Sequence, residues 1–109
     1  MAFDEGLAER LRDIYSEIDG VDERKMFGGL AFLVKGHMTC GIVDETLMVR
    51  VGKENYEQAL KKKHVREMDF TGKPLTGFIY VDHEGFESDE DLDAWVNTSL
   101  EFVKTLPPK

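Results

Sequence analysis

The sequence has a single cysteine, no long apolar run and no basic leader. Because Cys40 stands alone among the 109 residues, no internal disulfide can form, and a reducing, cytoplasmic location is expected. No apolar run exceeds five residues, which is too short for a membrane span, and the acidic start lacks the pattern of a secretory signal. We therefore predict one cytoplasmic domain over residues 1–109, with no membrane partner.

Basic residues are missing between Asp82 and Glu101, a stretch that holds eight acids. Elsewhere 14 acids balance the 14 Lys and Arg, which gives a net charge of -8. Phosphate binding needs clustered cations, so this balance disfavours direct nucleic-acid binding. The run Lys61-Lys62-Lys63 is interpreted as the solvated end of a helix, where cations complement the helix dipole. The alternative is a short phosphate-contacting patch of these three lysines with Arg66.

The residue patterns that carry catalysis or metal binding are also missing. The three histidines fall in separate elements, without the spacing of metal ligands. Cys40 lies on the predicted core face of a strand, where a thiol is inert. The acids at residues 89–91 open a helix and lack the spacing of a calcium loop. We predict no catalytic residues, no metal site, no cofactor and no enzyme activity.

Apolar spacing predicts three amphipathic helices, over residues 5–18, 53–62 and 88–105. Asp4 and Ser88 are the predicted N-caps of the first and third helices. We expect the apolar stripe of each helix to pack on a sheet. A partner-binding role for the first helix is the alternative.

Short apolar runs bounded by glycine and aspartate predict four antiparallel strands between the first two helices. A further strand over residues 78–81 is apolar on both faces, which indicates a central position, and residues 65–68 could add a short one. The predicted fold class is α+β with two layers. Helices lie mainly on one face of an antiparallel sheet of four to six strands, in the order α-β-β-β-β-α-β-α.

Counting from two-residue turns sets the predicted register, which pairs Val34 with His37 and Val43 with Thr46. The face that we expect the helices to cover is apolar and collects Met26, Ala31, Leu33, Met38, Cys40, Ile42, Leu47, Val49 and Val51, with Arg24 as its only charge. The opposite face is mixed and collects Lys25, Phe27, Leu30, Phe32, Val34, His37, Thr39, Gly41, Val43, Met48 and Arg50. An aromatic-rich sheet face usually needs a cover. The last helix, a second subunit or another protein could supply it.

Three stretches carry a resemblance to a known family: Arg24 to Leu30 (Arg-Lys-Met-Phe-Gly-Gly-Leu), Leu47 to Val51 and Phe70 to Phe78. With the Lys35-Gly36 hairpin and the closing helix, they resemble the N-terminal domain of the TfoX/Sxy family, which contains bacterial regulators of competence for DNA uptake. The resemblance covers nearly the whole chain and implies a stand-alone single-domain member. Competence regulators of this family act with a transcription activator and carry a second domain after this one.

The first functional hypothesis is a non-catalytic regulatory domain that binds a protein. Its partner would be a transcription factor or a second copy of the chain in a homodimer. The candidate contact residues are Arg24, Lys25, Phe27, Gly28, Gly29, Phe32 and Arg50. The alternative is a sensor of small anionic ligands, or a weak enzyme, with a pocket near Gly41, Thr39 and Arg50.

Overall fold

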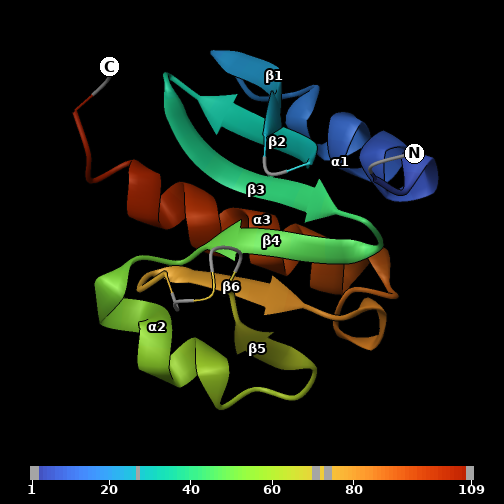
Figure 1. The fold of residues 1–109 in the computed structure, drawn as a ribbon. Helices are drawn as coiled ribbons and strands as arrows, with labels where there is room; N and C mark the ends of the chain where they lie inside the picture. Colours follow the sequence, from blue (N-terminus) through green and yellow to red (C-terminus); the bar gives the residue numbers. More distant parts are fainter. Residues whose placement is uncertain (1–2, 27, 70–71, 73–74, 108–109) are drawn as a thin grey trace.

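The structure is a computed structural model that describes residues 3–26, 28–69, 72 and 75–107. It contains three α-helices, six strands and one 3-10 turn in the described part of the chain (Figure 1). In chain order these are α1 (Glu5–Tyr15), β1 (Val21–Met26), β2 (Gly29–Val34), β3 (His37–Val43), β4 (Thr46–Arg50), α2 (Lys53–Leu60), β5 (Val65–Glu67), β6 (Phe78–Val81), η1 (His83–Gly85) and α3 (Asp89–Val103).

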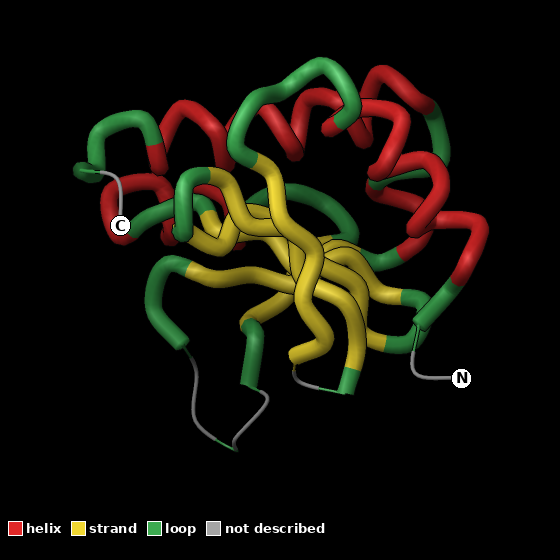
Figure 2. Tube along the Cα trace, turned by 90° about the horizontal axis from the view of Figure 1, so that it is seen from above, coloured by secondary structure: helices red, strands yellow, loops and turns green. Residues whose placement is uncertain are grey.

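The six strands form one antiparallel sheet in the order β1-β2-β3-β4-β6-β5. The meander from β1 to β4 follows the chain, and β6 then lies between β4 and β5. This arrangement confirms the predicted meander and the central position of residues 78–81. The helices lie on one side of the sheet (Figure 2), so the two-layer α+β prediction is also confirmed.

Both predicted helix caps are present. The Asp4 carboxylate accepts a hydrogen bond from the Gly6 amide at 2.9 Å, and the Ser88 hydroxyl accepts one from the Asp91 amide at 3.1 Å. Each helix ends two or three residues earlier than its apolar stripe predicts. After α1 and α3 the apolar stripe continues, because the half-buried Ile18 and Leu106 still pack inward from non-helical turns, whereas α2 is followed by exposed lysines.

The two predicted strand turns are also correct. Val34 pairs with His37 and Val43 with Thr46. Lys35 and Asp44 adopt positive φ angles of 51° and 56°, as two-residue hairpins with primed turns require.

The predicted register fails at one residue, Thr39. The pairing of β2 with β3 shifts between Phe32 and Leu33, so that Phe32 pairs with Cys40 and Leu33 with Met38. Thr39 is the extra residue of a β-bulge. Because one added residue exchanges the two faces of a strand, the face prediction is wrong before Thr39 and correct after it.

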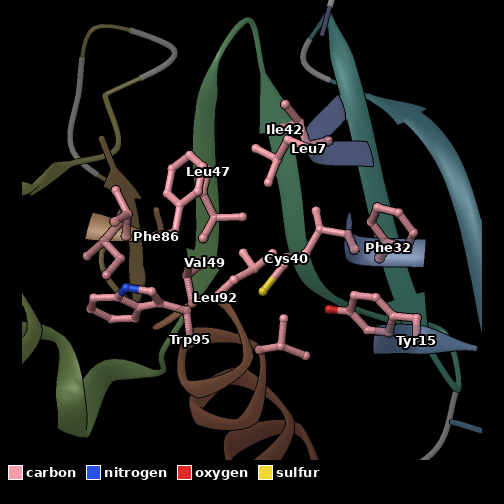
Figure 3. Close-up of a cluster of buried hydrophobic side chains, with 14 of the residues drawn as sticks. Leu7, Tyr15, Phe32, Cys40, Ile42, Leu47, Val49, Phe86, Leu92 and Trp95 are labelled. Atoms are coloured by element: carbon pink, nitrogen blue, oxygen red, sulfur yellow. The ribbon is translucent and has the colours of Figure 1, made fainter. Parts of the chain in front are cut away.

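The corrected faces define two apolar clusters. The larger one lies between sheet and helices (Figure 3); its strand residues are Leu30, Phe32, Val34, Cys40, Ile42, Leu47, Val49, Ile79 and Val81, with Val51 just beyond β4. The smaller one lies on the opposite side, called the helix-free face below; its buried members are Ala31, Leu33, Met48, Met68 and Tyr80. The segment that follows β5 contributes Met68 to the helix-free face, which is therefore partly covered by the chain itself.

Candidate functional site

Several apolar side chains of the helix-free face are only partly buried. Met38, Val43, Leu75 and Phe78 pack against the small cluster while keeping part of their surface in solvent. The Leu75 amide donates a hydrogen bond of 2.9 Å to the Met68 carbonyl, which joins two residues of this side. The face is therefore a mostly apolar surface with a partial cover.

Arginines stand around this apolar surface. Arg24 pairs with Ala31 at the β1 edge and is exposed. Arg66 lies at the opposite edge, with its guanidinium 5.1 Å from the centre of the Tyr80 ring. Its Nη2 is 3.0 Å from Asp82 Oδ1, and about half of its side chain is exposed. Cationic groups thus border the apolar surface on both sides.

The Tyr80 hydroxyl is protonated at neutral pH. Burial raises its pKa, and the nearby Asp69 carboxylate raises it further. A protonated phenol under a guanidinium offers an aromatic ring and a hydrogen-bond donor at the same place. Neither Tyr80 nor Arg66 is among the predicted contact residues. The two residues meet through the cross-strand pairing of β5 with β6, which local spacing in the sequence does not reveal.

The residues of the Arg-Lys-Met-Phe-Gly-Gly motif do not converge with Arg50. Arg24 and Lys25 are exposed on the β1 edge strand and point to opposite faces, because adjacent strand residues alternate. Arg50 lies at the end of β4, three strands away, which is about 14 Å across the sheet. The expectation that Lys25 and Arg50 share a face is therefore wrong, and Phe27 lies outside the described residues.

The two glycines of the motif serve different structural needs. Gly28 has a φ of 73°, which favours glycine in the turn. Gly29 is buried and pairs with Met26, and a Cβ there would collide with the Ile42 carbonyl. Gly29 is thus required by close strand packing, not by a positive φ.

Phe32 belongs to the core. Its side chain is 0% exposed and stacks on Tyr15 of α1 with ring centres 4.8 Å apart (Figure 3). The predicted pocket near Gly41 and Thr39 is also not formed: Thr39 is fully buried against Tyr15, and Met48 packs closely over Gly41. The predicted register puts Phe32 and Thr39 on the mixed face because it lacks the bulge at Thr39.

Arg50 lines a surface groove of about 490 Å³ where β4 and β6 meet α2 and α3. Its guanidinium carbon lies 5.6 Å from the centre of the Phe78 ring and 5.2 Å from that of Phe102. Partial burial lowers the pKa of Arg50, although the group stays charged at neutral pH. Of the two cations expected on one face, only Arg50 is thus held in a concave site.

A second groove, of about 510 Å³, lies between the start of β3 and the end of α3. His37 borders it, and its Nε2 is 2.6 Å from the Pro107 carbonyl oxygen. Val34 and Leu106 supply apolar walls. The contact between His37 and Pro107 holds the chain after α3 against the sheet. We therefore assign this groove a structural role.

Cys40 is a buried core thiol. It is 0% exposed, and burial raises its pKa to about 12. In the described part of the chain, no three His, Cys, Asp or Glu side chains are grouped to hold a metal ion. None of the described helices combines the length and apolar character that a bilayer span requires.

A search of curated proteins finds no match. The family model described as the TfoX N-terminal domain matches residues 13–103. That range contains the whole sheet, α2 and α3, together with the end of α1. The chain therefore belongs to the TfoX N-terminal domain family, which makes it a competence-regulator-like domain.

Proposed function

We propose that this domain is a non-catalytic regulatory module that binds a protein partner through the helix-free face of its sheet. The observation that carries the proposal is the combination on that face of partly exposed apolar side chains with bordering arginines. Membership in a family with competence regulators supports a regulatory role. The partner would be a transcription factor or a second copy of the chain.

The residue types on the helix-free face are those enriched where proteins bind one another. Tyrosine, phenylalanine, methionine and arginine are over-represented at interface centres, and tyrosine and arginine often dominate the binding energy. All four types are found on this side of the sheet: Met38 on β3, Phe78 and Tyr80 on β6, and Arg66 on β5. The buried part of each side chain fixes its position, so less conformational entropy is lost on binding.

Charge reversal at the border of the face tests the proposal. We expect Arg24→Glu combined with Arg66→Glu to abolish partner binding, because both arginines would meet the partner at the rim of the apolar surface. The matched control is Lys61→Glu with Lys63→Glu, which makes the same charge change on exposed residues at the end of α2. The two double variants should have the same far-ultraviolet circular dichroism as the wild type.

Two measurements identify the partner class. Size-exclusion chromatography with light scattering, over a range of concentrations, tests for a dimer that the face variant loses and the control keeps. Quantitative affinity purification from the native host tests for a different protein with the same dependence. The proposal fails if the face variant keeps every association that the wild type makes.

A sensor of small anions is the second candidate function. The groove beside Arg50 supports this candidate, because it contains the cation that was expected to bind the anion. The predicted pocket near Gly41 and Thr39 is not formed, so the groove would take its place.

A further inference from the structure

We propose that the groove beside Arg50 binds a small monocarboxylate with an apolar body. The inference rests on the second candidate function and names its ligand class. The groove is formed where β4 and β6 meet α2 and α3; it shares Phe78 with the partner surface proposed above, but neither Arg24 nor Arg66 lines it. Its volume of about 490 Å³ is within the range of small-molecule sites.

Arg50 is held in place by aromatic contacts and has no acceptor in the part of the chain that the structure describes. The Phe78 and Phe102 rings, 5.6 Å and 5.2 Å from the guanidinium carbon, hold the side chain from β6 and α3. Among the described residues, Arg50 makes no hydrogen bond or ion pair, whereas Arg12 and Arg66 bond to Glu23 and Asp82. A positioned guanidinium with free N–H groups fits a carboxylate bidentately.

Backbone groups of two glycines, Gly52 and Gly77, shape the groove. The amides of Val51 and Gly52 both donate to the Gly77 carbonyl, at 2.8 Å and 3.1 Å, which joins the segments after β4 and before β6. A Cβ at Gly52 would collide with the Phe102 ring. Glycine at this position therefore allows Phe102 to approach closely enough to reach Arg50. The groove depends on this packing and not on a mobile segment.

The charges of the groove favour a monoanion over a dianion. Besides Arg50, the lining residues include one further cation, Lys53, and two acids, Glu54 and Glu101. The acids oppose a second negative charge on the ligand. The ring faces of Phe78 and Phe102 offer apolar surface next to the cation. A carboxylate attached to an apolar group satisfies both features better than inorganic phosphate does.

The test is a titration of the ¹⁵N-labelled protein with sodium benzoate at pH 7, followed by NMR and calorimetry. We expect saturable shifts of the Arg50 Nε–H and of the Lys53 and Gly77 amides. Arg50→Gln should weaken benzoate binding by about tenfold or more, because a charge-assisted contact is lost. Arg50→Lys should bind benzoate more weakly than the wild type does, because lysine keeps the charge but lacks the planar guanidinium that bonds a carboxylate bidentately.

Two further variants separate binding from folding. Glu101→Gln removes a rim carboxylate and should tighten benzoate binding by about twofold, which a damaged fold would not do. Arg24→Gln, which changes an exposed arginine outside the groove, should leave benzoate binding unchanged. Inorganic phosphate serves as the competing anion and should bind more weakly than benzoate.

Three results would overturn the inference. The wild type could show no saturable shifts at groove residues, Arg50→Gln could bind benzoate as tightly as the wild type, or phosphate could bind more tightly than benzoate. None of these results affects the partner-surface proposal, which depends on Arg24 and Arg66. Conversely, a partner-binding defect of the Arg24→Glu/Arg66→Glu variant would not change benzoate affinity.

Discussion

The Thr39 hydroxyl lies 2.6 Å from the Tyr15 hydroxyl in the buried core. Thr39 also donates to the Phe32 carbonyl at 2.9 Å, so it accepts the hydrogen bond from Tyr15. These two bonds connect α1 to the bulge between β2 and β3 and satisfy polar groups that water cannot reach. The bulge is thus stabilised by a side chain from a different element.

Removing the Thr39 hydroxyl should destabilise the protein without changing side-chain volume. We expect Thr39→Val to lower the free energy of unfolding by about 1–3 kcal/mol, because the Tyr15 hydroxyl would remain buried without a partner. Urea denaturation followed by circular dichroism measures the change. Thr46→Val is the control, since Thr46 is half-buried on β4 and should lose under about 0.5 kcal/mol. Equal losses in both variants would contradict the stated role of Thr39.

Truncating Phe32 should lower the stability of the fold, because Phe32 is a core residue and not a surface contact. We expect Phe32→Ala to cost about 3–5 kcal/mol, as for other fully buried aromatic residues, and Phe32→Asp to prevent folding. Met38→Ala, at a half-buried position of the helix-free face, should cost less. Thermal denaturation compares the two. A folded Phe32→Asp variant would show that the stacking on Tyr15 is dispensable.

Stability should decrease at alkaline pH because of the buried thiol. Burial raises the pKa of Cys40 from 9.0 to about 12, so the folded state keeps the proton that the unfolded chain loses. The free energy of unfolding should therefore stay constant below about pH 8 and fall above pH 9, by up to about 1.4 kcal/mol per pH unit until the folded thiol also ionises near pH 12. Burial also raises the pKa of Tyr15, which adds a loss in the same direction at higher pH.

Two measurements check the alkaline prediction. Urea titrations between pH 7 and pH 11 should show a shallower loss for Cys40→Ala than for the wild type. The folded wild type should resist a disulfide reagent at pH 8 and react when unfolded in urea. Rapid, stoichiometric labelling of the folded protein would show that the thiol is accessible.

The Ser88 cap should contribute measurably to α3. Ser88→Ala removes the acceptor of the Asp91 amide and should cost about 1 kcal/mol. Ser16→Ala is the matched control, because the exposed Ser16 hydroxyl donates to the Asp13 carbonyl after the last turn of α1 and caps no helix start. Thermal melts of the two variants should therefore differ by several degrees. Indistinguishable melting temperatures would show that the acids of the first turn replace the cap.

Most of the fold could be predicted because its determinants are local. Turn residues such as Lys35 and Asp44 fix the hairpins, and the caps Asp4 and Ser88 fix two helix starts. The faces of β1 and β2 could not be predicted, because they depend on one extra residue in β3. Thr39 is bulged toward a hydroxyl of α1, and such a tertiary contact leaves no periodic signal in the sequence.

The candidate site was predicted less completely than the fold. Arg50 could be identified because it follows the bulge, where the face prediction is correct. Phe32 was misassigned because it precedes the bulge. Arg66 and Phe102 were missed because their positions depend on β5 pairing with β6 and on α3 packing near the end of β4. Neither arrangement can be deduced from local spacing.

The position of β6 between β4 and β5 also constrains the order of folding. The hairpins from β1 to β4 close short loops, whereas β6 must close a long one to reach β4, which costs more chain entropy. Among the described strands, β5 pairs only with β6 and is three residues long, so a single short ladder holds this edge of the sheet. Native-state hydrogen exchange should show the least protection in β5. The sheet is therefore expected to assemble from its N-terminal hairpins and to open first at the β5 edge.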